Sequence, residues 1–267
     1  MVALNSCNSV GFQYREEDMQ EAELQISTAE GLMDAFVCHP EEGGEYPSVI
    51  IYMDAPGIRE ELRDMARRLA TVGYYVLLPN MYYRIGREGS YGFDLGNTIN
   101  LDSEREKMFS VMRSLTNSMV ISDTGALLDH LRATELVAKG GIGCIGYCMS
   151  GQYVMSVGAA YPSEFAAIAS FYGVGIITEE QDSPHLKAHK IRGEVYLAFA
   201  SKDPWVPKKT LDSLPTFLAD AGVKHRVEVY PDTEHGFAFP QRPVYVKAAA
   251  ERHWERIFAL LGRNLKS

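Results

Sequence analysis

The chain has 267 residues, of which 46% are hydrophobic, and a formal net charge of -9. An acidic surface repels phosphate groups, so this composition argues against nucleic acid or an anionic membrane as the main partner. The length is sufficient for one α/β domain with a large buried core.

The cysteines indicate a reducing compartment. They are Cys7, Cys38, Cys144 and Cys148, and they form neither a C-x-x-C pair nor a zinc-ligand spacing with a histidine. The first 20 residues lack the basic and apolar regions of a secretory signal, and no apolar run is long enough to cross a membrane. We therefore predict a cytoplasmic protein with no metal or organic cofactor.

The first part of the chain predicts a hairpin followed by a β-α-β unit. Residues 1–21 are expected to be an N-terminal extension, and residues 22–267 a single domain. The expected elements are, in chain order, strands at 22–28, 32–40 and 47–53, a helix at 59–73 and a strand at 74–79. The helix places Leu62, Met65 and Leu69 on one face, which is typical of a helix packed on a sheet.

Residues 80–104 interrupt this rhythm because they are rich in Gly, Asn, Tyr and charged residues. A long aperiodic stretch within a compact domain is typical of a functional loop. Helices are expected at 105–115 and 119–138. We interpret the run over about 80–117 as an insertion that covers the site and sets its selectivity.

The second half again alternates strands and helices. The expected elements are a strand at 140–145, a helix from 152, strands at 165–173 and 194–200, a helix at 207–222 despite Pro215, a strand at 226–231 and a helix at 243–262. Alternation of this kind predicts an α/β fold with a mostly parallel central sheet, an N-terminal antiparallel hairpin and helices on both faces.

The stretch "GYCMSG" places Cys148 on the corner between a strand and a helix. It resembles the G-x-S-x-G turn, with Gly146 as the first glycine, Cys148 as the nucleophile and Ser150 where the second glycine usually stands. The N-terminus of the next helix favours a thiolate and a neighbouring oxyanion. The alternative interpretation is a buried structural cysteine, which is how we read Cys38 and Cys144.

A base and an acid with suitable positions follow later in the chain. Asp203 comes directly after the strand at 194–200, and His235 lies in the loop after the strand at 226–231. This is the chain order nucleophile, acid, histidine, and the carboxyl ends of parallel strands meet at one edge. Cys148, Asp203 and His235 are therefore the predicted catalytic residues.

The other histidines are weaker candidates. His130 and His253 fall within predicted helices, where we expect them to be solvated or capping. His185 and His189 lie in a polar loop. The acidic side chains beside His235 do not end a strand and are expected at the surface.

Four stretches together resemble the dienelactone hydrolase family of the α/β-hydrolase fold. They are "GYCMSG", "SKDPWVP", "EHGF" and "YMDAPGIREELRDMARRLATVGYYVLLPNMYYR", and the likeness runs from about residue 22 onward. The resemblance implies a hydrolase of carboxylic esters or lactones with a Cys148–His235–Asp203 triad. It also implies an oxyanion hole made by the backbone N–H groups of Met149 and Ala55, and a small-molecule substrate.

The resemblance also bears on the substrate. The family places a glutamate in the early loop, and Asp54 stands at that position; the alternative is a turn residue before Pro56. An arginine four residues after the histidine is replaced here by Phe239. Arg242 and Arg105 are candidate replacements.

An apolar pocket is the other interpretation of the same region. The aromatic residues that would form it are Tyr82, Tyr83, Trp205, Phe237 and Phe239. On this interpretation dienelactone itself is not the expected substrate.

Two other functions fit parts of the sequence. An exposed thiolate is also what peroxide oxidises, so a redox-sensing protein on the same scaffold without hydrolytic activity is the alternative. A binding-only protein would leave the order of the three predicted catalytic residues unexplained. The sequence leaves the oligomeric state open, a homodimer included.

Overall fold

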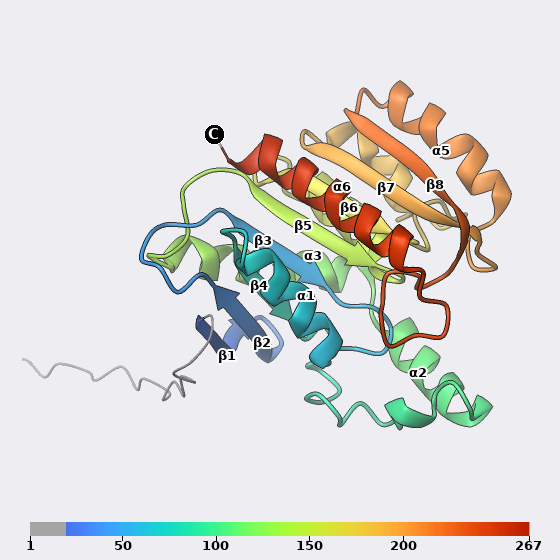
Figure 1. Cartoon of the computed structure of the whole chain (residues 1–267), viewed down its shortest axis with the longest axis horizontal. Coiled ribbons are helices and arrows are strands. Elements are labelled where there is room, and N and C mark those ends of the chain that lie inside the picture. Colours follow the sequence, from blue (N-terminus) through green and yellow to red (C-terminus); the bar gives the residue numbers. More distant parts are fainter. Residues whose placement is uncertain (1–19, 267) are drawn as a thin grey trace, which may run out of the picture.

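The computed structural model describes residues 20–266. Its centre is an eight-stranded sheet with the strand order β1-β2-β4-β3-β5-β6-β7-β8 (Figure 1). The strands are β1 (Gln20–Thr28), β2 (Gly31–His39), β3 (Ser48–Tyr52), β4 (Tyr75–Pro79), β5 (Ile142–Tyr147), β6 (Phe165–Phe171), β7 (Glu194–Lys202) and β8 (His225–Glu234).

The sheet is antiparallel at its N-terminal edge and parallel elsewhere. β1 pairs with β2, and β2 with β4, in antiparallel register, whereas β4, β3 and β5 to β8 run parallel. Every residue of β3, β4 and β5 is buried, which is the pattern of strands covered on both faces. The α/β fold with a mostly parallel sheet and an N-terminal hairpin is thus confirmed.

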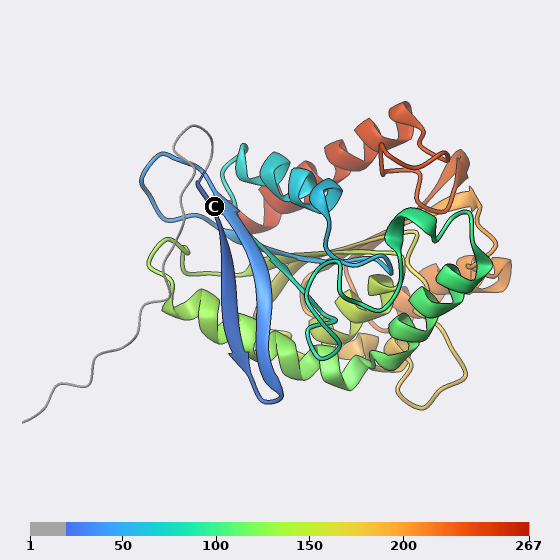
Figure 2. The same cartoon turned by 90° about the horizontal axis from the view of Figure 1, so that it is seen from below.

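Six α-helices are described: α1 (Glu60–Ala70), α2 (Asp102–Ser114), α3 (Asn117–Ala133), α4 (Ser150–Ala160), α5 (Lys208–Asp220) and α6 (Lys247–Leu265). Figure 2 shows α1 and α6 on one face of the sheet and α3, α4 and α5 on the other. The predicted apolar face of α1 is buried, with Leu62, Met65 and Leu69 in the core. In residues 20–266, none of the helices combines the length and apolar character that a bilayer crossing demands.

Two predictions about local structure were wrong. The helix expected at 119–138 begins at Asn117, where Thr116 caps it, and ends at Ala133. It stops early because the residues after it pair with Tyr46. The Tyr46 N–H donates to the Leu136 carbonyl oxygen, and Tyr46 forms an isolated parallel β-bridge with Val137. The loop around 184–190 forms a 3-10 helix instead of irregular chain.

His253 was predicted to be solvated or capping, and it is fully buried. The buried residues of α6 recur every three or four positions, and His253 falls on that stripe. Its Nε2 lies 2.8 Å from the hydroxyl of Tyr147, the residue that directly precedes Cys148 in the chain. Burial lowers the pKa of His253 to about 3, so this imidazole is neutral at neutral pH.

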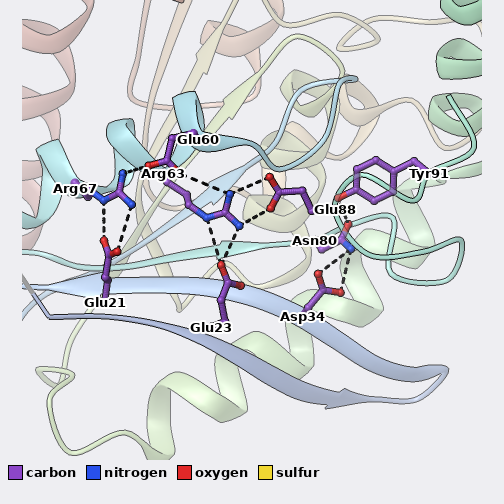
Figure 3. A network of polar contacts seen from close by, with 9 residues as sticks. All are labelled: Glu21, Glu23, Asp34, Glu60, Arg63, Arg67, Asn80, Glu88 and Tyr91. Carbon is purple, nitrogen blue, oxygen red and sulfur yellow. Dashed lines mark hydrogen bonds and ion pairs between the residues drawn. The ribbon is translucent and has the colours of Figure 1, made fainter. Parts of the chain in front are cut away.

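A polar network fixes the start of the segment that follows β4. Figure 3 shows its members: Glu21, Glu23, Asp34, Glu60, Arg63, Arg67, Asn80, Glu88 and Tyr91. Arg63 of α1 pairs with Glu23 of β1 and Glu88, so it ties the hairpin to this segment. Asn80 donates to Asp34 and accepts from the Tyr91 hydroxyl. The base of the segment is therefore held to both the hairpin and α1.

Small residues allow a close approach at the turn between β5 and α4. A Cβ on Gly151 would lie 2.3 Å from the Gly173 Cα, and one on Gly146 would lie 2.4 Å from the Ser150 carbonyl oxygen. Ser150, at the place of the second glycine, is accommodated because its hydroxyl is buried and donates to the Met53 carbonyl. The turn thus tolerates a serine at 150 and requires glycine at 146 and 151.

We predict that Gly151→Ala lowers the free energy of unfolding by about 1–3 kcal/mol, because the methyl group would overlap backbone atoms. Urea denaturation measures this change. Gly262→Ala is the matched control, since Gly262 lies within α6 and a Cβ there meets nothing within 4 Å. The control is expected to raise stability by up to about 1 kcal/mol. Equal effects of the two substitutions would contradict the packing interpretation.

Candidate active site

The candidate site lies where the chain direction switches in the sheet. β3 is flanked by β4 on one side and β5 on the other, so the loops after β3 and β5 diverge and leave a crevice beyond their carboxyl ends. A cavity of about 280 Å³ opens there. It is lined by Ala55, Pro56, Met108, Phe109, Met112, Arg113, Cys148, Val174, Trp205, His235 and Arg242.

Cys148 sits on a strained turn at the floor of this cavity. Its φ of 54° is in the left-handed region, which is unusual for a residue with a Cβ. Its N–H donates to Phe171 O, and its carbonyl accepts from the N–H groups of Gly151 and Val174. These bonds hold the strained backbone in place while the half-buried side chain faces the cavity.

Two backbone N–H groups near Cys148 have no protein acceptor. Within residues 20–266, neither the Met149 nor the Ala55 amide donates a hydrogen bond to another protein group. Met149 directly precedes α4, so the helix N-terminus adds partial positive charge at this point. An anion next to Cys148 would find donors here.

The structure brings His235 and Asp203 together. The His235 Nδ1 lies 2.8 Å from the Asp203 Oδ2. The other carboxylate oxygen, Oδ1, accepts from the Trp205 N–H at 2.9 Å, which fixes the carboxylate orientation. The imidazole is 11% exposed and the carboxylate 1%, so the pair is shielded from water while His235 still reaches the cavity.

The charge state of His235 follows from its neighbours. Burial lowers the pKa of this imidazole, but the nearby Cys148 and the Asp203 carboxylate raise it by more, to about 9. The site therefore combines a half-buried sulfur that lines the cavity with a positively charged neighbour.

Tyr172 is a contact of His235 that the sequence did not predict. Its ring centroid lies 5.0 Å from that of the imidazole. Its φ of 41° is also left-handed, and its buried hydroxyl has no hydrogen-bond partner within the described residues. The sequence around it reads only as the end of an apolar strand, so no signal marked it.

Asp54 is buried in a cluster of four charges. It pairs with Arg59 at 2.5 Å and with Arg242, and Arg59 also pairs with Glu61 at 2.9 Å. Two carboxylates and two guanidinium groups balance in charge, which is the usual condition for burying them. Asp54 also accepts from the Gly57 N–H through its carbonyl oxygen, so it is a turn residue as well.

The predicted aromatic residues divide into two groups. Trp205 lines the cavity, whereas Phe237 and Phe239 are fully buried and do not line it. The guanidinium groups of Arg59 and Arg242 both pack on the Phe239 ring, with Cζ atoms 4.7 and 5.0 Å from its centroid.

Of the predicted residues Tyr82, Tyr83 and Arg105, only Tyr82 contacts residues of the site, and it does so without lining the cavity. Its buried hydroxyl lies 3.1 Å from the Ala55 carbonyl oxygen and 3.1 Å from the Met149 sulfur. Tyr83 instead contacts Thr28 and Asp123. Arg105 is paired with Asp102 on α2 and does not line the cavity.

The cavity walls include residues that the sequence analysis did not single out, although it predicted that their segment covers the site. Met108, Phe109, Met112 and Arg113 all come from α2, within the run predicted to cover the site. Their spacing of three and four residues puts them on one helical face, and that spacing was the available signal. In the described part of the chain, no three His, Cys, Asp or Glu side chains are grouped as metal ligands would be.

The strand order and the turn at Cys148 define the fold as that of the α/β-hydrolases. A model of the dienelactone hydrolase family matches residues 33–265. The chain therefore belongs to the dienelactone hydrolase family and is a hydrolase, as the resemblance predicted.

Individual relatives agree with this assignment. The chain is 29% identical over 235 residues to a protein of Synechocystis sp. that is provisionally named carboxymethylenebutenolidase, covering 86% of this chain and 92% of the relative. A protein of Methylorubrum extorquens with the same provisional name is 26% identical over 238 residues, covering 88% and 78%.

Solved structures share the fold. A structure provisionally assigned as a dienelactone hydrolase from Klebsiella pneumoniae superposes with a TM-score of 0.79 at 23% identity, covering 92% of this chain and 99% of the other. A dienelactone hydrolase-like promiscuous phosphotriesterase from metagenomic libraries gives a TM-score of 0.74 at 21% identity, covering 92% and 98%.

We predict that His235 titrates near pH 9. The raised pKa means that the imidazole is charged at neutral pH and loses its proton as the pH rises through about 9. In Asp203→Asn the pKa should fall, because one of the groups that raise it is lost. NMR of ring-labelled histidine measures both values, with His253 as an internal control that stays neutral between about pH 5 and 10. A wild-type pKa below the ordinary histidine value of about 6.5 would contradict the expected pairing.

Proposed function

We propose that the chain hydrolyses a carboxylic ester or lactone, with Cys148 as nucleophile, His235 as base and Asp203 as the group that orients the base. The observation that carries this proposal is the 2.8 Å contact between His235 Nδ1 and Asp203 Oδ2, beside a strained and accessible Cys148 at the floor of a cavity. The names of the curated relatives, which denote hydrolysis of a lactone, point to the same reaction class.

In the proposed first half-reaction, the Cys148 thiolate attacks the substrate carbonyl carbon. The Nδ1–H of His235 donates to Asp203, so Nε2 is the atom that shares the proton of the thiol. The carbonyl electrons move to the oxygen, and the free N–H groups of Met149 and Ala55 stabilise the resulting oxyanion. The C–O bond then breaks, and His235 protonates the leaving alcohol oxygen.

In the second half-reaction, water replaces the alcohol. His235 takes a proton from this water, the hydroxide attacks the thioester carbon, and the same two N–H groups stabilise the second oxyanion. Collapse releases the carboxylic acid and returns the thiolate. For a lactone the alcohol and the acid leave as one molecule, because the ring has been opened.

The sulfur chemistry suits a thiol paired with an imidazole. Cys144 and Cys38 are fully buried, and burial raises the pKa of both thiols, so they remain protonated and shielded. Among the described cysteines, only Cys148 lines the cavity; Cys7 lies outside the described residues.

We predict that Cys148→Ala and His235→Ala each lower kcat/KM for 4-nitrophenyl acetate by at least about 1000-fold, because each removes a group that acts in the transition state. Asp203→Asn should reduce it by about 100-fold or more. Steady-state assays measure these changes, and intact mass spectrometry of the quenched reaction should show an acetyl adduct on the wild type only.

His189→Ala is the matched control, since His189 lies in the 3-10 helix at Pro184–Lys190 and is exposed. It should retain wild-type turnover. Full activity of Cys148→Ala would disprove the proposed nucleophile. Wild-type protein that lacks esterase activity, but whose Cys148 reacts rapidly with hydrogen peroxide, would favour the redox-sensing alternative.

A further inference from the structure

The roof of the cavity is made by one face of α2. Met108, Phe109 and Met112 point to the same side of this helix and line the cavity together with Val174 and Trp205. Phe109 and Trp205 meet edge to face, with ring centroids 5.7 Å apart, so α2 is joined here to the loop that carries Asp203. Most of the cavity lining is thus thioether, aliphatic or aromatic, and its charged members are His235, Arg113 and Arg242.

Each cationic side chain that lines the cavity already has a carboxylate neighbour, as His235 has Asp203. Arg242 is paired with buried Asp54, which lies in the balanced four-charge cluster. Arg113 lies at the rim, where its side chain is 61% exposed and lies 3.7 Å from Glu106. A carboxylate on the acyl part of a substrate would lose its hydration in a mostly apolar cavity and would meet only cations whose charge is already balanced by a neighbouring carboxylate, which is costly.

We infer that the substrate is an uncharged ester or lactone whose acyl part is apolar and packs against Met108, Phe109 and Met112 of α2. This inference rests on the proposed function and names its substrate class. A volume of about 280 Å³ is that of roughly nine water molecules, which suits an acyl group of short to medium length. The lactone in the name of the relatives carries a carboxymethylene group, so the substrate inferred for this chain differs from it in charge.

The test compares 4-nitrophenyl esters of increasing acyl length. From acetate to hexanoate, kcat/KM should rise about fourfold for each added methylene that the cavity buries. The valerate should exceed the anionic hemisuccinate, which has a similar length, by on the order of 100-fold. The wild-type series by itself decides the inference, because a flat series or a preference for the hemisuccinate would overturn it.

Variants then locate the subsite. Phe109→Ala should reduce the gain per methylene to about twofold, because the acyl chain loses part of its wall. Val111→Ala is the matched control, since Val111 is on the same helix and does not line the cavity. If kcat/KM rises about fourfold per methylene in both variants, the acyl group does not pack against Phe109. Turnover of the acetate that depends on Cys148 shows that the proposed function holds even where the length dependence fails.

A second inference comes from Tyr82, which lies behind the two free N–H groups. Its hydroxyl is 3.1 Å from the Ala55 carbonyl oxygen and 3.1 Å from the Met149 sulfur. Ala55 belongs to the loop after β3, and Met149 to the turn after β5. One hydroxyl thus contacts both segments that would supply the oxyanion hole.

Tyr82 is itself rigidly held. Its backbone N–H donates to the Asn80 side chain, and its ring packs edge to face on Tyr91 at 5.3 Å. Both partners belong to the polar network at the base of the segment after β4 (Figure 3). The position of the hydroxyl is therefore fixed from a side that does not touch the substrate.

We propose that Tyr82 is a positioning residue that sets the separation of the Ala55 and Met149 N–H groups. Its hydroxyl donates to the Ala55 carbonyl, the stronger acceptor, and rests against the thioether, the weaker one. Small displacements of oxyanion donors have large effects on rate. This second inference also rests on the proposed function.

We expect Tyr82→Phe to lower kcat for 4-nitrophenyl butyrate by about 10- to 100-fold with little change in KM. The rate of Cys148 alkylation by iodoacetamide should stay within about twofold, because alkylation forms no oxyanion and still depends on the thiolate. Met149→Leu removes only the weaker contact and should have an effect of about threefold or less.

Tyr161→Phe is the control, because it removes a hydroxyl that donates to the Ile121 carbonyl and contacts neither Ala55 nor Met149. It should leave kcat within about twofold. The proposal fails if Tyr82→Phe retains wild-type kcat, or if alkylation and turnover fall together. Failure of the proposed function itself would be seen differently, as equal ester turnover by the wild type and by Cys148→Ala.

Discussion

The left-handed backbone at Cys148 is the constraint on which the rest of the site depends. A residue with a Cβ adopts this conformation only where its surroundings enforce it, and here three backbone hydrogen bonds and the close approach of Gly151 to Gly173 do so. The strain is offset by burial in β5 and α4 on either side. As a result, the Cys148 side chain lines the cavity beyond the sheet, and the next amide, that of Met149, has no acceptor within the described residues.

Other groups reach this point because parallel strands end at one edge. Asp203 and His235 follow β7 and β8, and Asp54 and Ala55 follow β3, so each is placed by a strand of the central sheet. This is why chain order and strand ends alone could predict that Cys148, Asp203 and His235 lie at one edge of the sheet. The sheet and its hairpin were equally accessible, because fully buried strands leave a plain apolar pattern in the sequence.

Features that depend on contacts between distant segments were not accessible in this way. His253 lies on a helix whose apolar stripe reads clearly, but its contact with Tyr147 spans 106 residues. The pairing of Arg242 with Asp54 spans 188 residues, and a sequence reports neither partner. The early end of α3 likewise results from pairing with Tyr46. Local propensity largely determines which segments form helices and strands, whereas contacts with distant segments determine the burial and pairing of single polar side chains.

The four-charge cluster joins the two halves of the site. Asp54 and Arg59 belong to the loop after β3, which carries Ala55, whereas Arg242 belongs to the loop after β8, which carries His235. Because unpairing a buried charge is costly, the two loops hold one another in register. Phe239, on whose ring both guanidinium groups pack, adds contacts to the same junction. The aromatic residue at this position thus supports the loops from within, whereas the apolar side chains that line the cavity come largely from α2.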